Sequence, residues 1–205
     1  MWVFFPFNGP GRAKVVFINI KLGKIGEHVG DWEHVTLRIS NLDGQLWQMY
    51  LSQHQGGSWI DSSQLEFQPI TSYFDFPTKR PIVYATLHGH ATYPHEGLVL
   101  GGKNGIGVRD DTDKGSIMDM AKYVLVSADY LGSVQEPSWL NFFREWGPRI
   151  DYNLDDQLEV LKKFLLIRKL KDAFENMIRG LPKEMLGEEG PTGPKVKNSW
   201  NDDEV

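Results

Sequence analysis

The 205-residue chain carries 22 Lys and Arg against 27 Asp and Glu residues, which gives a formal net charge of −5, and it has no cysteine. This acidic balance argues against nucleic acid as a partner, because phosphate binding normally needs a basic face. Without cysteine, histidine and carboxylate groups must bind any metal. No apolar run approaches the roughly 20 residues that cross a bilayer, and no signal peptide is recognisable. We therefore expect a soluble, cytoplasmic protein, with peripheral contact with endomembranes as an alternative.

The first two thirds of the chain has the short alternating apolar runs that are typical of β-strands. The turn sequence at 41–44, Asn-Leu-Asp-Gly, separates two of these runs and predicts a hairpin. The glycine-dense stretch 101–107 and the acidic stretch 109–113 are expected to be loops. The spacing indicates a sandwich or a barrel, and we favour a mainly β fold, an antiparallel β-sandwich. The expected strands are 13–20, 31–39, 46–54, a short run around Trp59, 81–87 and 123–127.

The last third of the chain has a helical pattern. Leu158, Leu161 and Leu165 recur at helical spacing among Lys and Arg residues, which predicts one amphipathic, basic carboxy-terminal helix between residues 155 and 179. We favour a surface helix that covers an open face of the sheet over a helix that binds a membrane or a partner.

The limits of the domain follow from these patterns. Residues 1–186 are expected to form a single β-sandwich domain with a flanking helix. Residues 187–205 are rich in Gly, Pro and charge, and are expected to be a flexible tail. The apolar run from Met1 to Phe7 has no polar lead-in, so we expect a fragment of a longer protein, whose missing amino-terminal region would be a partner.

The segment around His28 has the composition of half a metal site. In an extended strand side chains alternate, so Asp31 and Glu33 would point to one face and could share a cation, while Trp32 would point to the other. Gly30 could let the His28 imidazole fold back toward the same cation. This segment predicts a divalent-cation site at the start of a strand.

The other histidines are candidates for the rest of the site, because all six lie between residues 28 and 95. His54 ends an expected strand. His88 and His90 would share one face of an extended strand, and His90 is preferred as a ligand or proton shuttle because a rigid turn follows it. His34 is expected to be satisfied within the sheet, and His95 to be an exposed loop residue.

The candidate ligands limit which metal the predicted site could bind. Mg or Ca is favoured if oxygen ligands dominate, whereas Zn or Fe becomes an alternative if further histidines join. Nearby aromatic side chains could offer a stacking face to a ligand. A serine hydrolase is disfavoured, because no Gly-x-Ser-x-Gly elbow is present. The metal-ligand candidates are His28, Asp31, Glu33, His54 and His90, and the stacking candidates are Trp32, Trp59 and Tyr93.

Several blocks of the sequence resemble a known family. The blocks closely resemble the plant branch of the vacuolar protein sorting-associated protein 62 family, over essentially the whole chain. Members of that family are considerably longer, and this chain resembles their carboxy-terminal portion. The resemblance implies a trafficking role and no particular activity. The blocks are 5–10, 24–34, 50–54, 88–94, 143–148 and 187–195.

The pattern His28-x-x-Asp31-Trp32-Glu33 also resembles the signature heptapeptide of the Nep1-like necrosis-inducing cytolysins. Their β-sandwich binds a divalent cation through a His, an Asp and a Glu of that motif and docks on plant membrane sphingolipids. The resemblance implies that His28, Asp31 and Glu33 are cation ligands. Gly30 stands where those toxins have a second His, so a fourth ligand is open.

Three functions remain for this site. We favour divalent-cation-dependent binding of a polar lipid head group or a glycan, at a membrane surface in vacuolar trafficking or defence. The first alternative is a metal-assisted hydrolase with Glu33 or His90 as the general base. The second is a non-catalytic trafficking scaffold, in which the His and acidic groups satisfy one another and the basic helix engages a partner.

Overall fold

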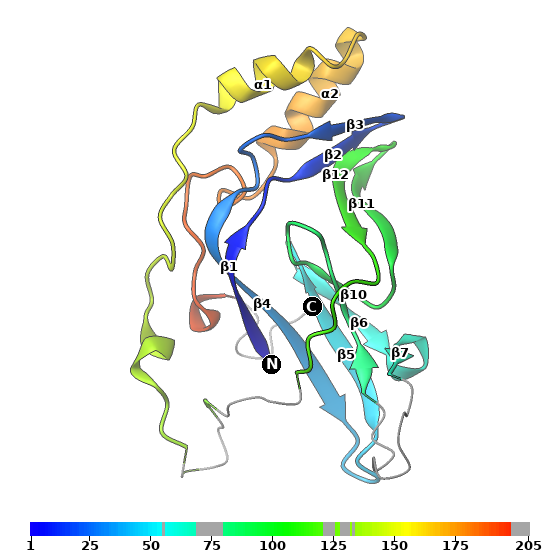
Figure 1. Cartoon of the computed structure of the whole chain (residues 1–205), viewed down its shortest axis with the longest axis vertical. Coiled ribbons are helices and arrows are strands. Elements are labelled where there is room, and N and C mark those ends of the chain that lie inside the picture. Colours follow the sequence, from blue (N-terminus) through cyan, green and yellow to red (C-terminus); the bar gives the residue numbers. More distant parts are fainter. Residues whose placement is uncertain (55, 69–79, 121–125, 128–131, 133, 198–205) are drawn as a thin grey trace.

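Antiparallel β-sheets make up most of the structure, which is a computed structural model (Figure 1). It describes residues 1–54, 56–68, 80–120, 126, 127, 132 and 134–197. Within these ranges there are two four-stranded sheets, two two-stranded sheets and two α-helices. The prediction of a mainly β, antiparallel fold is confirmed, and the sheet arrangement is compatible with the expected sandwich. None of the described helices has the length and apolar character needed to span a bilayer.

The first sheet has the strand order β1-β4-β5-β6. Its longest strand, β4, pairs with β1 through residues 28–34 and with β5 through residues 35–39. The first half of β4 therefore has no β5 partner. The strands are β1 (Trp2–Asn8), β4 (His28–Ile39), β5 (Leu46–Gln53) and β6 (Gly56–Asp61).

The second sheet has the order β11-β12-β2-β3. The single strand predicted over 13–20 is wrong, because the chain turns at Val16, where φ is +56°, and returns as β3. The loops predicted at 101–107 and 109–113 are also wrong. Asn104 and Gly105, both at positive φ, form a tight turn that joins two long strands. The strands are β2 (Arg12–Val15), β3 (Ile18–Lys21), β11 (Gly97–Lys103) and β12 (Ile106–Thr112).

Shorter elements fill the middle of the chain. The strand predicted over 81–87 is broken into β8 (Pro81–Ile82) and β9 (Tyr84–Ala85), which pair with β7 (Glu66–Phe67) and β10 (Thr92–Tyr93). The strand predicted over 123–127 lies largely outside the described residues, and Val126 and Ser127 are not in a strand. Three 3₁₀-helices complete the described elements: η1 (Ser62–Gln64), η2 (Ser138–Asn141) and η3 (Pro194–Val196).

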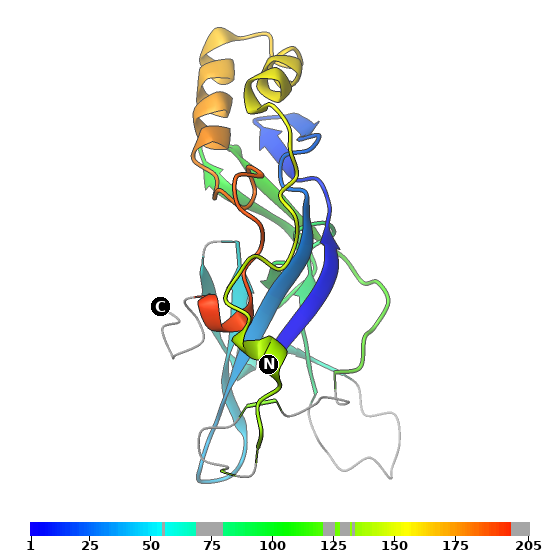
Figure 2. The same cartoon turned by 90° about the vertical axis from the view of Figure 1, so that its left-hand side faces the viewer.

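Two helices cover the second sheet at one end of the molecule (Figures 1 and 2). The single helix predicted over 155–179 is instead α1 (Leu154–Lys162) and α2 (Arg168–Arg179). The chain leaves the helix between them because Leu165, only 1% exposed, turns into the core, and Ile167 is extended. The predicted stripe of three leucines is buried. It packs with Phe174 and Ile178 of α2 against Val15, Ile20 and neighbouring residues of the sheet.

The carboxy-terminal segment returns from α2 to the first sheet. Residues 187–197, which the sequence assigned to a flexible tail, pack against the rest of the chain: Pro191 and Pro194 are fully buried, and Thr192 forms a β-bridge with Glu145. Nearby, the Trp32 and Trp139 rings stack on each other, and Trp146 contacts both of them edge-on. Residues 198–205 lie outside the described part of the chain.

The buried ring of Phe174 should dominate the stability of the helical end. We expect Phe174→Ala to lower the free energy of unfolding by about 3–5 kcal/mol, because it leaves a cavity in a close-packed core. Phe164→Ala is the matched control, since Phe164 belongs to the turn that joins the two helices and its side chain is 62% exposed. Its cost should be under about 1 kcal/mol. Equal losses in denaturant titrations followed by circular dichroism would contradict this packing.

Candidate metal centre and polar cavity

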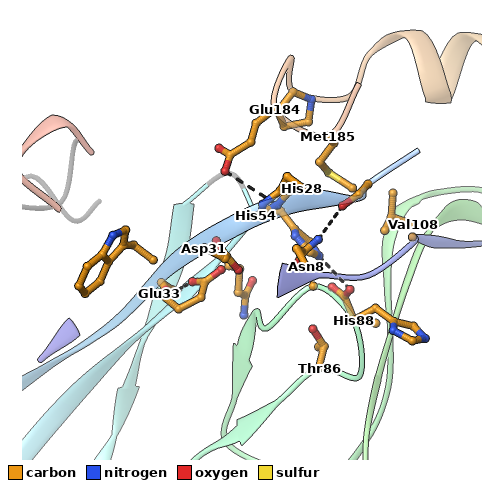
Figure 3. A pocket seen from close by; sticks show the side chains of 18 of the residues that line it. Asn8, His28, Asp31, Glu33, His54, Thr86, His88, Val108, Glu184 and Met185 are labelled. Atoms are coloured by element: carbon orange, nitrogen blue, oxygen red, sulfur yellow. Dashed lines mark hydrogen bonds and ion pairs between the residues drawn. The ribbon is translucent and has the colours of Figure 1, made fainter. Parts of the chain in front are cut away.

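A polar cavity of about 510 Å³ lies beside the first half of β4 (Figure 3). Its wall is completed by the end of β5, the turn at 87–89, β12 and the segment 182–185 that follows α2. Segments far apart in sequence thus meet there. The titratable residues that line it are Arg12, His28, Asp31, Glu33, His34, Tyr50, His54, His88, Arg109, Asp110, Asp111, Glu184 and Lys197.

Three of these side chains are close enough to hold one metal ion. One ligand atom each of His28, Asp31 and Glu184 lies within 4.8 Å of the others. His28 and Asp31 are 7% and 3% exposed, and Glu184 is half-buried. Sequence reasoning found the first two and missed Glu184, which follows α2 in a Pro-Lys-Glu stretch without any local signal.

The backbone at Gly30 sets the orientation of His28. Gly30 has φ +80°, a conformation that residues with a Cβ rarely adopt. Its carbonyl oxygen accepts a hydrogen bond of 2.8 Å from His28 Nδ1. When Nδ1 carries the proton, a neutral His28 presents the lone pair of Nε2, which lies 3.9 Å from Glu184 Oε1. A lone pair and a carboxylate face each other unfavourably unless a cation or a proton lies between them.

Asp31 is held by groups from two other segments. His90 Nδ1 donates a 3.0 Å hydrogen bond to Asp31 Oδ2. Lys197 Nζ lies 4.0 Å from Asp31 Oδ1 and donates to the Trp32 carbonyl oxygen at 2.8 Å. His90 is not in an extended strand as predicted: it follows a turn, has φ +54° and stacks on Phe5 at 3.9 Å. It contacts the carboxylate and stands outside the three-residue group.

Glu33 lies on the cavity side of β4, as the alternation predicted. Ser52 Oγ donates a hydrogen bond to Glu33 Oε2. Of its neighbours on β4, Trp32 stacks on Trp139, and the His34 ring stacks on Trp2. Burial and then the negative charge of Asp31 raise the pKa of Glu33 to about 7. Its role as a metal ligand stays a prediction, because it is not part of the group that the structure brings together.

A second set of polar groups lies on the β12 wall. Asp110, 6% exposed, binds His54 Nε2 through Oδ1 at 2.9 Å and accepts from the Tyr93 hydroxyl through Oδ2 at 2.7 Å. Burial alone would lower the pKa of His54, but the bond to Asp110 and nearby carboxylates outweigh it and raise the pKa. Burial and Asp110 raise the pKa of Tyr93, which therefore stays a phenol. His54 thus contacts Asp110, and its role as a fourth ligand stays a prediction.

Two buried oxygen atoms of the cavity wall have no hydrogen-bond partner among the described residues. They are Asn8 Oδ1 and Thr86 Oγ1, in side chains that are 5% and 4% exposed. Asn8 is fixed by its amide, which donates to the Gly26 carbonyl oxygen at 2.6 Å. Leaving such an atom unpaired costs about 1–3 kcal/mol. These atoms are therefore acceptor sites for a bound molecule or for water.

The three aromatic candidates lie in different environments. Trp32 is 8% exposed and packs among Trp139, Trp146 and Phe4. The Trp59 ring lies 3.6 Å from the Arg38 guanidinium. Tyr93 is 7% exposed and reaches the cavity wall through Asp110. Stacking of a ligand on any of them stays a prediction.

Comparison of the sequence with family models identifies the family of the chain. The family model described as vacuolar protein sorting-associated protein 62 matches residues 1–204. The chain belongs to this family. Family membership connects the chain with vacuolar protein sorting. No curated protein and no solved structure matches it.

The raised pKa of Glu33 predicts a pH dependence of folding. A carboxyl with a folded-state pKa of about 7 and an ordinary value of 4.5 binds its proton more tightly in the folded state. The stabilisation is therefore complete below pH 4.5 and is lost as the pH rises through 7. We expect the free energy of unfolding of the native chain, relative to Glu33→Gln, to fall over this range in the presence of a chelator. Denaturant titrations that give a constant difference would contradict it.

Proposed function

We propose that this chain is a divalent-cation-dependent binding module for a polar lipid head group or a glycan. His28, Asp31 and Glu184 would hold the cation, with Glu33 as a further candidate beside them. The proposal fits a family connected with vacuolar protein sorting. The ligand would bind in the polar cavity, and none of its covalent bonds would be broken.

The observation that carries the proposal is the arrangement of His28 and Glu184. The Nε2 atom faces a carboxylate oxygen at 3.9 Å, and the Asp31 carboxylate belongs to the same group. The Gly30 carbonyl oxygen accepts a hydrogen bond from the other ring nitrogen, Nδ1. A divalent cation would turn this repulsion into binding. Two of the three donors are carboxylates, which keeps Mg or Ca as the favoured cation, and the imidazole keeps Zn or Fe as alternatives.

The rest of the cavity suits a ligand with hydroxyl groups. Asn8 Oδ1 and Thr86 Oγ1 offer buried acceptors, and Thr86 can also donate. The cation would bind a hydroxyl or phosphate oxygen on the other side. Free anions are disfavoured, because Asp31, Glu33 and Asp110 would repel them in the absence of the cation.

A metal-assisted hydrolase is the second candidate, and the pKa of Glu33 favours it. A carboxyl with a pKa of about 7 can accept a proton from water near neutral pH, which is the property of a general base. His90 suits this role less well, because it is not among the residues that line the cavity. Loss of turnover in Glu33→Gln, with the metal and the ligand still bound, would favour the hydrolase over the binding module.

Metal content tests the proposed site directly. We expect elemental analysis by mass spectrometry to find about one divalent ion per chain in protein purified without chelator or affinity metal. Asp31→Asn and Glu184→Gln should both lose it. Glu188→Gln is the matched control, four residues further on and exposed, and it should retain the ion.

No stoichiometric metal in the native chain, even after titration with Ca and Mg, would overturn the cation site. His28 and Glu184 would then form an ordinary ion pair with a protonated imidazole, and the scaffold function would be favoured. If the ion is present, native chain and Asp31→Asn should be compared on arrays of glycans and lipid head groups, with and without chelator. Chelator-sensitive binding by the native chain alone supports the module.

Lys197 should weaken cation binding. Its ammonium lies 4.0 Å from Asp31 Oδ1, where it would repel a divalent cation. We expect Lys197→Met to bind Ca or Mg about tenfold more tightly in calorimetric titrations, because that repulsion is removed. Lys195→Met is the matched control, since the Lys195 ammonium binds Glu136 instead. An unchanged affinity for Ca or Mg in Lys197→Met would show that the Lys197 ammonium does not repel the bound cation.

A further inference from the structure

The turn between α1 and α2 exposes a group of large apolar side chains. Phe164, Leu166 and Ile167 are 62%, 95% and 59% exposed. Leu165, between them, is 1% exposed and belongs to the core under the helices. This buried residue anchors the turn, so its three apolar neighbours are held outward. We call Phe164, Leu166 and Ile167 the apolar tip.

Basic residues flank the apolar tip on both sides in the sequence. Lys163, Arg168 and Lys169 are exposed, and none of them lies within ion-pair distance of a carboxylate in the described ranges. Lys162 differs, because it is paired with both Glu159 and Glu175. The turn thus carries three exposed apolar side chains and three positive charges without an ion-pair partner among the described residues, all within residues 163–169. We call Lys163, Arg168 and Lys169 the basic collar.

The position of the turn makes it accessible. Figures 1 and 2 both show α1 and α2 at one end of the elongated molecule, with the turn that joins them projecting away from the sheets. The cavity beside β4 lies nearer the middle. The tip is therefore separate from the proposed cation site and needs none of its residues.

The chemistry of the tip matches a bilayer better than a protein groove. A stable protein interface buries about 1,200–2,000 Å² in total, which three side chains on a convex turn do not supply. A bilayer accepts protruding apolar groups without a complementary shape, and its anionic head groups attract Lys and Arg at the level of the interface. The chain as a whole carries a net charge of −5, so its other surfaces would be repelled by such a membrane.

We propose that the α1–α2 turn is the docking point of this chain on anionic lipid bilayers. The apolar tip enters the interface between head groups and acyl chains, and the basic collar binds the anionic head groups around it. Docking through one end leaves the cavity facing the aqueous side. This inference is independent of the proposed cation site.

Vesicle co-sedimentation tests the docking point. The native chain should bind phosphatidylcholine vesicles that contain phosphatidylserine, and bind vesicles of phosphatidylcholine alone at least about tenfold more weakly. The double variant Leu166→Ser, Ile167→Ser and the double variant Lys163→Glu, Lys169→Glu should each lose about tenfold or more on the anionic vesicles. Leu42→Ser, at a turn far along the first sheet, is the matched control because Leu42 is fully exposed, and it should bind like the native chain.

Insertion of the apolar tip into the bilayer can be measured separately. Because the chain has no cysteine, a single introduced cysteine can be labelled with a dye. An environment-sensitive dye on Leu166→Cys should report an apolar environment when anionic vesicles are added, and the same dye on Leu42→Cys should not respond. Chelator should leave the response of the dye on Leu166→Cys unchanged, which separates insertion of the apolar tip from any binding of a head group in the cavity.

Three outcomes would overturn the docking point. The first is a native chain that does not bind anionic vesicles. The second is full binding by both double variants. The third is a concentration-dependent dimer in analytical ultracentrifugation that Leu166→Ser, Ile167→Ser abolishes, since the turn would then be an interface between two copies of the chain.

Discussion

The buried charge of Asp31 is the constraint on which the centre of this molecule depends. A carboxylate that is 3% exposed needs compensating partners, because desolvation of an unpaired charge is costly. Its compensation comes from His90 and Lys197, on segments that lie far from it in the sequence. The turn that carries His90 and the segment that carries Lys197 are therefore tied to β4 by electrostatics as well as by packing.

The hydrophobic cores explain why this polar centre can exist. One core lies between the two helices and the second sheet, and another joins Val35, Met49, Leu51 and Leu65 around the far half of β4. An aromatic cluster of Trp32, Trp139 and Trp146 packs beside the first half of β4. Apolar burial on several sides supplies the main stabilisation. It also holds the polar wall residues in fixed positions.

The sequence predicted what is local and missed what is brought together by the long-range fold. The faces of Asp31, Glu33 and Trp32 followed from strand alternation, and the buried leucines of α1 followed from helical spacing. Glu184 and Asp110 carry no local signal, because their place at the cavity depends on the return of the chain after α2 and on the pairing of β12. The helix and strand breaks at Leu165 and Val16 were missed for a related reason: apolar periodicity continues across a turn when both arms bury residues in one core.

The bond from Lys197 to the Trp32 carbonyl oxygen joins residues 165 positions apart. During synthesis on a ribosome, β4 emerges long before the segment that holds Glu184 and Lys197. The nascent chain must therefore carry Asp31 and His28 without these partners until almost all of the described residues have left the exit tunnel. The centre of the molecule is completed last, so an intact centre reports that translation has passed residue 197.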